Sequence, residues 1–316
     1  MANTLISAVV CTYNRSRSLR ETLECLAAQQ ADGFDYEVVV VDNHSTDDTK
    51  AAVASCQAAF GGRLRYVFEP RQGKPYALNT GVRAATGELI AFTDDDTKPD
   101  PSWLRSLRDT ILAFDADCAY GKILPLWMGE RPEWLGEYFL RRLALLDRGE
   151  EPFIVTSTGL EFYGANVAIR KEALARVGEF NVHLGNRGRR IGGEEDEDLF
   201  LRLLASGARV VYTPHAVVHH KVPPERMSPA YFWRWHFGHG MAEAYLTPCE
   251  RGKGLLGIPF WAVKGLFNDL ARCVGSLVGT DVEARLIAQM RLLRGLGLIV
   301  EKLKIATGRG SACSRS

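Results

Sequence analysis

Short apolar runs alternate with longer amphipathic segments through the first third of the chain, and this alternation restricts the possible folds more than any other feature. The apolar runs span residues 5–13, 36–42, 63–69 and 88–94. Helix-like segments follow them, from near Ser18, from about Thr46, over Pro75 to Ala85, and from near Pro101. Strand and helix in this order predict an α/β fold with a mostly parallel central sheet flanked by helices.

Polar residues stand where three of these predicted strands end, at residues 12–14, 42–45 and 94–96. Ligands of such sheets bind beyond the carboxyl ends of the strands, so we expect these residues to share one crevice. Asp94, Asp95 and Asp96 are adjacent and repel one another. A divalent cation such as Mg²⁺ or Mn²⁺, held together with phosphate oxygens of a substrate, would relieve that repulsion, whereas the alternative is a solvated acidic turn.

The pattern is less regular after Asp96. It predicts a strand over residues 117–123, a helix over 132–146, a strand over 162–169 and a helix over 171–176. A Gly- and Arg-rich loop over 178–193 precedes five consecutive acids, Glu194 to Asp198, which open a further helix. Capping of a helix start needs fewer acids than this, so we expect a chemical role for some of them. A strand-like segment over 208–220 ends in two histidines.

Composition excludes several classes of protein. The formal net charge of +1 argues against a nucleic-acid binder that works through overall positive potential. The seven cysteines are scattered and include no Cys-x-x-Cys pair, which favours reduced thiols in the cytoplasm. The N-terminal sequence lacks the features of a signal peptide, and no apolar stretch is long enough for a membrane-spanning helix. We therefore expect a cytoplasmic protein.

Six motifs occur in an informative order: VVCTYNRSRSLRETL, VVVVDNHSTDDT, GKPYALNTGVRAATGELIAFTDDD, GANVAIRKEAL, EEDEDLFLRL and TPHAVVHH. In this order and spacing they resemble the family-two glycosyltransferases, which adopt the GT-A fold and use sugar nucleotides. The resemblance covers roughly residues 5–221 and implies a GT-A (nucleotide-diphospho-sugar transferase) catalytic domain over residues 1–225. A C-terminal helical extension, basic and amphipathic, would occupy residues 226–316.

The resemblance implies a nucleotide-sugar pocket for which a UDP-sugar is the expected donor. Asp42 would accept a hydrogen bond from the base, Lys74 would approach the nucleotide, and Asn166 would lie on a strand that faces the donor sugar. The full set of residues expected to bind the donor is Thr12, Tyr13, Asn14, Arg15, Asp42, Asn43, Lys74, Asn79, Asp94, Asp95 and Asn166.

The resemblance also implies a metal site. Asp94 and Asp96 match the outer positions of the family's Asp-x-Asp motif, with Asp96 the direct ligand of Mg²⁺ or Mn²⁺ and Asp94 on the ribose side. His220 would complete the metal sphere or contact the diphosphate. His219 is the alternative to His220. A purely structural role for His220 is also open. A metal that bridges the phosphates stabilises the charge that develops on the leaving group.

By alignment with the family's Glu-Asp-x-Asp motif, Asp196 is the base that takes a proton from the acceptor hydroxyl. The extra acid Glu194 before the motif leaves Glu195 as the alternative. With one base and no carboxylate placed as a nucleophile, the family implies a single displacement that inverts the anomeric centre. Arg187 to Arg190 are expected to fold over the diphosphate as a lid.

The C-terminal region is aromatic and basic, with 11 Lys and Arg against 5 Asp and Glu from Glu250 onward. The aromatic segment 228–246 is interpreted as core packing or as part of an acceptor site. The segments 254–277 and 283–305 are amphipathic, which favours either peripheral contact with an anionic membrane or a packed helical hairpin. A membrane contact would suit a lipid-linked or other glycan acceptor and the cytoplasmic face of the inner membrane.

Two other functions compete with sugar transfer. A nucleotidyltransferase would need a Gly-rich phosphate loop after the first strand, and the sequence CTYNRSRSL contains no glycine there. A catalytically inactive carbohydrate- or nucleotide-sugar-binding scaffold would share the fold. Such a scaffold has no use for both the aspartate triplet and the acidic helix start, so an enzyme is the favoured interpretation.

Overall fold

The computed structural model describes residues 4–160, 162–186, 193–247 and 254–307. These form two compact units. The first comprises residues 1–128, 143–182 and 195–222, and the second comprises residues 129–142, 183–194 and 223–316. The main boundary after Val222 lies close to the expected end of the catalytic domain at residue 225, whereas two internal segments belong with the C-terminal helices.

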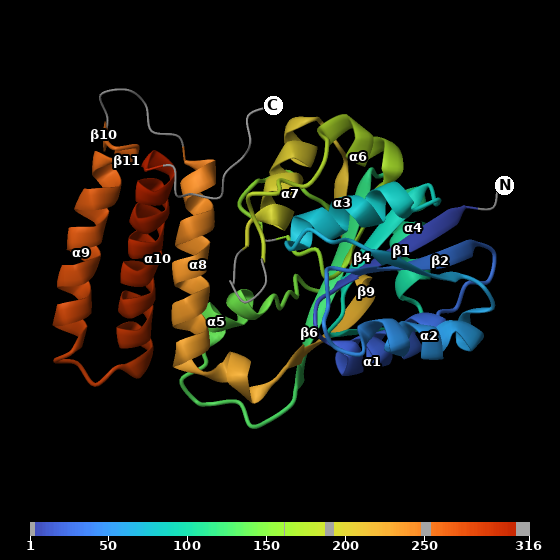
Figure 1. The fold of residues 1–316 in the computed structure, drawn as a ribbon, viewed down its shortest axis with the longest axis horizontal. Coiled ribbons are helices and arrows are strands. Elements are labelled where there is room, and N and C mark those ends of the chain that lie inside the picture. Colours follow the sequence, from blue (N-terminus) through green and yellow to red (C-terminus); the bar gives the residue numbers. More distant parts are fainter. Residues whose placement is uncertain (1–3, 161, 187–192, 248–253, 308–316) are drawn as a thin grey trace. The chain divides into compact units, whose positions relative to one another are not determined.

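The first unit contains a central sheet with helices on its faces. The strands are β1 (Leu5–Thr12), β2 (Asp35–Asp42), β3 (Leu64–Phe68), β4 (Leu89–Asp94), β5 (Thr97–Pro99), β6 (Cys118–Trp127), β7 (Phe153–Ile154), β8 (Val167–Arg170) and β9 (Val210–Val222). The helices are α1 (Ser16–Ala27), α2 (Thr49–Phe60), α3 (Lys74–Ala84), α4 (Trp103–Ala113), α6 (Lys171–Val177) and α7 (Glu195–Ala205). The helices α1 and α2 lie on one face of the sheet and α3 lies on the other (Figure 1).

The strand order β3-β2-β1-β4-β8-β6-β9-β5 explains where ligands can bind. From β1 the chain moves outward to β2 and β3, and it then returns to the other side of β1 as β4. The order therefore reverses between β1 and β4, which is the point where open α/β sheets bind ligands. In the register Thr12 pairs with Asp42, and Cys11 pairs with Asp94, so the three carboxyl ends are level.

The parallel strands are apolar because both of their faces are covered. Val38 to Val41 in β2 are fully buried, as expected for a strand between two layers of helices. Beyond β4 the sheet is mixed, since β8 runs antiparallel to both β4 and β6, and β5 and β7 run antiparallel to β9. The expectation of an α/β sheet flanked by helices is confirmed, with fewer parallel pairs than the strand–helix alternation alone predicts.

The predicted helix over residues 132–146 is wrong. Only Glu137–Leu140 (α5) and the 3₁₀ turn Arg141–Leu143 are helical, because Ala144 adopts a left-handed backbone with φ of 55° and Leu146 pairs with Ile123 of β6. The predicted strand over 162–169 is also shorter and begins only at Val167.

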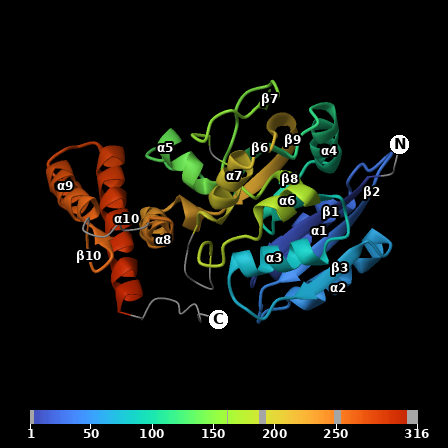
Figure 2. The same ribbon diagram turned by 90° about the horizontal axis from the view of Figure 1, so that it is seen from above.

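The second unit contains α8 (Pro229–Leu246), α9 (Phe260–Ser276) and α10 (Val282–Ala306), with a small hairpin of β10 (Gly254–Leu255) and β11 (Ile258–Pro259) before α9. Helix α10 lies between α8 and α9 (Figures 1 and 2). Glycines allow α8 and α10 to approach closely, since a Cβ on Gly240 would lie 1.9 Å from the Arg294 carbonyl. No helix among the described residues is long and apolar enough to cross a membrane.

Candidate active site

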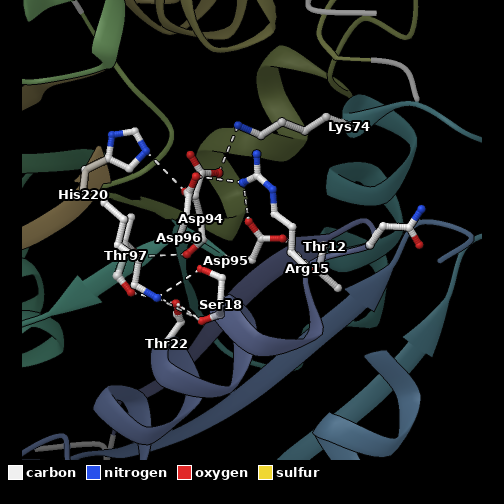
Figure 3. Close-up of polar contacts among 12 residues, drawn as sticks. Thr12, Arg15, Ser18, Thr22, Lys74, Asp94, Asp95, Asp96, Thr97 and His220 are labelled. Atoms are coloured by element: carbon white, nitrogen blue, oxygen red, sulfur yellow. Dashed lines mark hydrogen bonds and ion pairs between the residues drawn. The ribbon is translucent and has the colours of Figure 1, made fainter. Parts of the chain in front are cut away.

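The aspartate triplet ends β4 at the point where the strand order reverses, and side chains from β1, the β1–α1 connection and β9 surround it (Figure 3). Thr12 Oγ1 donates a 2.7 Å hydrogen bond to Asp95 Oδ2. On the other side β5 pairs with β9 so that Thr97 lies opposite His220, which brings that histidine to Asp96. Predicted site residues from three distant parts of the sequence therefore meet here.

The protein's own cations relieve part of the repulsion among the aspartates. Arg15 Nη1 donates to Asp95 Oδ1 at 2.9 Å and to Asp96 Oδ2 at 2.8 Å. Both carboxylates raise the pKa of Arg15 well above its ordinary value, with Asp95 the larger influence. Burial raises the pKa of Asp95, and Arg15 opposes that rise. The divalent cation expected from the sequence is thus not the only means of balancing the triplet.

Asp96 and His220 have the arrangement that a metal site needs. His220 Nε2 lies 3.3 Å from Asp96 Oδ1, and Arg15 occupies the other carboxylate oxygen, Oδ2. His220 Nδ1 lies 2.9 Å from the carbonyl oxygen of Leu143. If Nδ1 donates to that carbonyl, as in most metal-binding histidines, the lone pair of Nε2 is directed toward Asp96. A carboxylate and an imidazole fit Mn²⁺ or Mg²⁺ only as a partial coordination set.

Within the described residues, no group of three or more His, Cys, Asp and Glu side chains is arranged to hold a metal ion by itself. This fits a cation that shares its coordination sphere with substrate phosphates, since Mg²⁺ is commonly held by one or two carboxylates plus phosphate oxygens. His219, the alternative to His220, lies 3.3 Å from Asp100 Oδ1. Neighbouring residues of a strand point to opposite faces, so only His220 reaches Asp96.

Lys74 connects the triplet to the acidic start of α7. Its Nζ lies 3.1 Å from Asp94 Oδ1 and 3.5 Å from Glu195 Oε1 (Figure 3 shows the contact with Asp94). Burial alone would lower the pKa of Lys74, but Asp94, Asp196 and Glu195 outweigh burial and raise it. Lys74 therefore stays protonated, as a cation between two groups of carboxylates.

Asp196 faces a pocket beside Lys74, and a glycine makes room for it. The backbone N–H of Gly164 donates a 2.9 Å hydrogen bond to Asp196 Oδ2. A Cβ at residue 164 would lie 2.6 Å from Asp196 Oδ1, so this approach requires glycine. The polar lining of the pocket includes Lys74, Asp94 and Asp196. Its apolar lining is Leu78, Phe92, Phe162, Val167, Ile169, Phe180 and Leu199.

The two candidate bases differ in their surroundings. Burial and the nearby charge of Asp196 raise the pKa of Glu195 to about 7, although Lys74 opposes the rise. Burial also raises the pKa of Asp196, and Lys74 and the Gly164 N–H oppose it. Glu195 is only 4% exposed and is absent from the pocket lining, whereas Asp196 is half-buried and lines the pocket. The geometry favours Asp196 for contact with a substrate.

Residues predicted to bind the nucleotide form a network of loops at the ends of β1 and β2. Asp42 accepts hydrogen bonds from the Ser45 N–H and the Tyr66 hydroxyl. Asn14, which has a left-handed φ of 53°, accepts from the Thr46 N–H at 2.7 Å. Asn43 accepts from the Gly73 N–H and donates to the Arg71 carbonyl, which fixes the turn before Lys74. Tyr13 is half-buried beside this network.

Asn166 and Asn79 do not belong to the site. Asn166 is fully buried: it accepts from Trp103 Nε1 and donates to the carbonyls of Lys122 and Ala216. Asn79 is 3% exposed and is hydrogen-bonded to the backbone of Phe180 through both of its amide atoms. The prediction that these asparagines contact the donor does not fit, because their polar atoms are used inside the protein. The expected lid residues Arg187 to Arg190 lie outside the described residues.

Gly164 contributes to the site, although the sequence analysis does not single it out. The sequence does contain a signal for it, because a glycine stands directly at the start of a motif that precedes a buried strand. Lys221 was also missed. Its backbone N–H donates to the Asp96 carbonyl at 2.9 Å, and its ammonium lies 3.1 Å from Ser18 Oγ. Lys221 thereby fixes the backbone that carries the candidate metal ligands.

A mixed α/β sheet whose switch point carries aspartates, a histidine and a second acidic cluster defines the class of GT-A glycosyltransferases. The comparisons agree with this class. The family model described as glycosyl transferase family 2 matches residues 7–178. The chain therefore belongs to glycosyl transferase family 2, and it is a glycosyltransferase.

Three similar proteins illustrate these comparisons. It is 30% identical over 250 residues to the succinoglycan biosynthesis protein ExoM of Rhizobium meliloti, covering 78% of this chain and 76% of the relative. It is 29% identical over 226 residues to a glucosyl-dolichyl phosphate glucuronosyltransferase of Haloferax volcanii, covering 69% of each. The mannosyltransferase PcManGT of Pyrobaculum calidifontis, solved with GDP-Man and Mn²⁺, has a TM-score of 0.61 at 21% identity, covering 96% of this chain and 87% of that structure.

Proposed function

We propose that the protein is an inverting, metal-dependent glycosyltransferase that moves a sugar from a nucleotide-sugar to a hydroxyl of a polysaccharide, lipid-linked or other glycoconjugate acceptor. The observation that carries this proposal is the position of Lys74, which contacts Asp94 of the triplet and Glu195 and lines the same pocket as Asp196. The aspartate triplet, expected at the donor diphosphate, and the acidic start of α7, expected to supply the general base, thus lie in the same unit. Sugar transfer from donor to acceptor requires that they do.

The donor diphosphate is assigned to the edge of the sheet at Thr12, Arg15 and Asp94 to Asp96. The nucleoside is assigned to the loops after β1 and β2, where Asp42 and the segment Tyr13 to Asn14 lie. A UDP-sugar remains the expected donor. Solved structures of similar fold carry both nucleotide types, since PcManGT holds GDP-Man, and a structure of S. aureus TarS (TM-score 0.51, 18% identity) holds UDP-GlcNAc.

Asp96 and His220 are assigned as the protein ligands of Mn²⁺ or Mg²⁺, with Asp94 nearby. When bound, the cation neutralises the charge that grows on the departing nucleoside diphosphate. Arg15, anchored by Asp95 and Asp96, is placed to hold a phosphate oxygen. Because its guanidinium is already fixed, Arg15 adds positive charge at the leaving group and does not have to reorient during the reaction.

Asp196 is assigned as the base, because it lines the pocket and Glu195 does not. In this assignment one Asp196 oxygen is fixed by the Gly164 N–H, and the carboxylate takes the proton of the acceptor hydroxyl as that oxygen attacks the anomeric carbon. Among the residues that the structure describes, Asp94 is the one carboxylate besides Asp196 that lines the pocket, and Lys74 holds it. A single displacement with inversion follows from one base and no nucleophile.

The acceptor is assigned to the glycan or lipid-linked class, and the site of action to the cytoplasmic face of a membrane. Relatives named succinoglycan biosynthesis protein and glucosyl-dolichyl phosphate glucuronosyltransferase support the assignment of the acceptor class. The catalytic machinery is assigned to the first unit and the contact with acceptor or membrane to the C-terminal helical region.

The test measures donor hydrolysis by purified protein over a panel of UDP-, GDP- and TDP-sugars, with and without Mn²⁺. The proposal expects one donor to be turned over only with the metal, and the sugar to be released with inverted anomeric configuration. Asp196→Asn is expected to bind that donor and lose turnover. The wild-type protein could instead bind the donor and neither hydrolyse it nor transfer its sugar when acceptor hydroxyls are supplied. That result would identify an inactive scaffold.

A further inference from the structure

Glu194, the extra acid before the Glu-Asp-x-Asp motif, has no part in the proposed chemistry. Its side chain is nevertheless largely covered, with 10% of its surface exposed, and its Oε1 lies 2.7 Å from His239 Nδ1 of α8. The next two acids have other partners: Glu195 lies 3.5 Å from Lys74 of α3, and Asp196 accepts a hydrogen bond from the loop before β8. Three consecutive acids therefore contact three different segments of the chain.

The backbone of Glu194 has an unfavourable conformation. Its φ of 75° lies in the left-handed region, which glycine adopts freely and a residue with a Cβ adopts only with strain. Just before this turn the Gly193 carbonyl accepts a 2.9 Å hydrogen bond from the Gly185 N–H, and just after it helix α7 begins at Glu195. A glutamate at a position suited to glycine indicates that its side chain has a purpose that outweighs the strain.

The residue that contacts Glu194 is itself held in place. The ring of His239 stacks on Trp235, one turn earlier in α8, with 4.7 Å between the ring centroids and 17° between the ring planes. At the next residue α8 lies against the backbone of α10, since a Cβ on Gly240 would lie 1.9 Å from the Arg294 carbonyl oxygen. Glu194 therefore meets a fixed ring on a tightly packed helix.

We infer that Glu194 is a positioning residue for the general base. Held by His239, its side chain fixes the left-handed turn that starts α7, and two residues later the chain presents Asp196 to the Gly164 N–H. Catalysis is sensitive to such placement, because a displacement of about 1 Å can lower a rate by about 10². The inference rests on the proposed function, in which Asp196 is the base.

Glu194→Gly separates the side chain from the backbone, because glycine keeps the turn without strain and removes the carboxylate. In donor hydrolysis, E194G should lower kcat by about ten- to a hundredfold and leave the KM for the donor unchanged. Its melting temperature should not fall, since relief of the strain favours the folded state. Glu194→Gln still offers an oxygen to the ring N–H, so its kcat should stay within about threefold of the wild type.

His239→Phe removes the same contact from the other side and keeps a ring that can stack on Trp235. It should lower kcat as E194G does, and the double variant should be no slower than either single variant, because both changes remove one interaction. Asp115→Gly is the matched control. Asp115 is another acid with a left-handed φ, of 46°, and its side chain is 89% exposed and does not line the pocket. D115G should turn over the donor like the wild type.

Amide hydrogen exchange gives a readout that needs no donor. The Gly164 N–H donates to Asp196, so its exchange should accelerate at least about fivefold in E194G and stay unchanged in D115G. Wild-type kcat and wild-type exchange in E194G would overturn the inference, as would additive losses of kcat in the double variant. A wild-type protein that turns over no donor would instead contradict the proposed function, and the exchange measurement alone would then decide whether Glu194 positions Asp196.

Discussion

The ammonium of Lys74 lies 3.1 Å from Asp94 Oδ1, and the same ammonium lies 3.5 Å from Glu195 Oε1. One cation thus connects the carboxylates at the end of β4 with the acidic start of α7, more than 100 residues further along the chain. This arrangement makes Lys74 a positioning residue that holds the geometry of the pocket and opposes the rise in the pKa of Glu195 and Asp196.

Lys74→Met is expected to move the acid limb of the pH–rate profile to higher pH. Loss of the cation removes the influence that opposes protonation of Glu195 and Asp196, so the pKa of each rises further. A base with a raised pKa is protonated over a wider pH range. Activity near neutral pH is therefore lower than in the wild type, and it continues to increase as the pH is raised. Lys98→Met, which removes a lysine paired with Glu21, is the control and should leave the profile unchanged.

Asp196→Asn is expected to lower kcat by about 10²–10⁴, the usual contribution of a general base, with little change in donor affinity. Glu195→Gln should cost less, because Glu195 is absent from the pocket lining and acts through Lys74. Single-turnover kinetics of the two variants distinguish the roles. A larger loss in E195Q than in D196N would reassign the base to Glu195.

Gly164→Ala is expected to reduce turnover strongly while the protein remains folded. The new Cβ would lie 2.6 Å from Asp196 Oδ1, which forces the carboxylate away from its hydrogen bond with residue 164. Gly159→Ala is the control, since the nearest atom to its Cβ is Ser157 Oγ at 3.5 Å. Comparable kcat in both variants, measured with saturating donor, would show that the position of Asp196 is not critical.

Glu37→Gln is expected to lower the free energy of unfolding by about 2–3 kcal/mol at neutral pH. Burial would raise the pKa of Glu37, but hydrogen bonds from Thr86, Ser7 and Arg65 outweigh burial and lower it to about 2. Because the pKa is lower in the folded state, the stabilisation is present above the ordinary value near 4.5 and is lost as pH falls toward 2.

Denaturant titrations of wild type and E37Q between pH 7 and pH 3 check this window. The difference between the two proteins should shrink as the pH falls. Glu88→Gln, which changes an exposed acid close to the same sheet, should alter stability by less than about 0.5 kcal/mol. A difference between wild type and E37Q that is constant over this pH range would contradict the assignment of the low pKa.

The sequence predicts much of the fold because the relevant signals are local. Apolar runs such as Val38 to Val41 can be buried on both faces only in a covered sheet, and the strand-end position of Asp94 to Asp96 follows from the alternation of strand and helix. The antiparallel course of β8 between β4 and β6 depends on pairing across long stretches of chain. No local pattern contains that information.

The site is predictable in part. The family motif favours His220 over His219, but the pairing of β5 with β9, which brings His220 to Asp96, depends on the tertiary structure. Asn166 and Asn79 are misassigned because spacing locates a residue on a strand or helix without saying which neighbours its amide meets. Both amides satisfy backbone or indole groups in the interior, which buried polar side chains generally must do.

Calorimetric titration of UDP and GDP into wild-type protein and into Asp96→Ala, each with Mn²⁺ and with EDTA, tests the central claim most directly. The account predicts that one nucleotide binds the wild type with Mn²⁺, that EDTA weakens this binding at least about tenfold, and that D96A binds equally weakly in both conditions. Nucleotide binding that is equal with Mn²⁺ and EDTA, or unaffected by D96A, would contradict a metal-assisted nucleotide site at the end of β4.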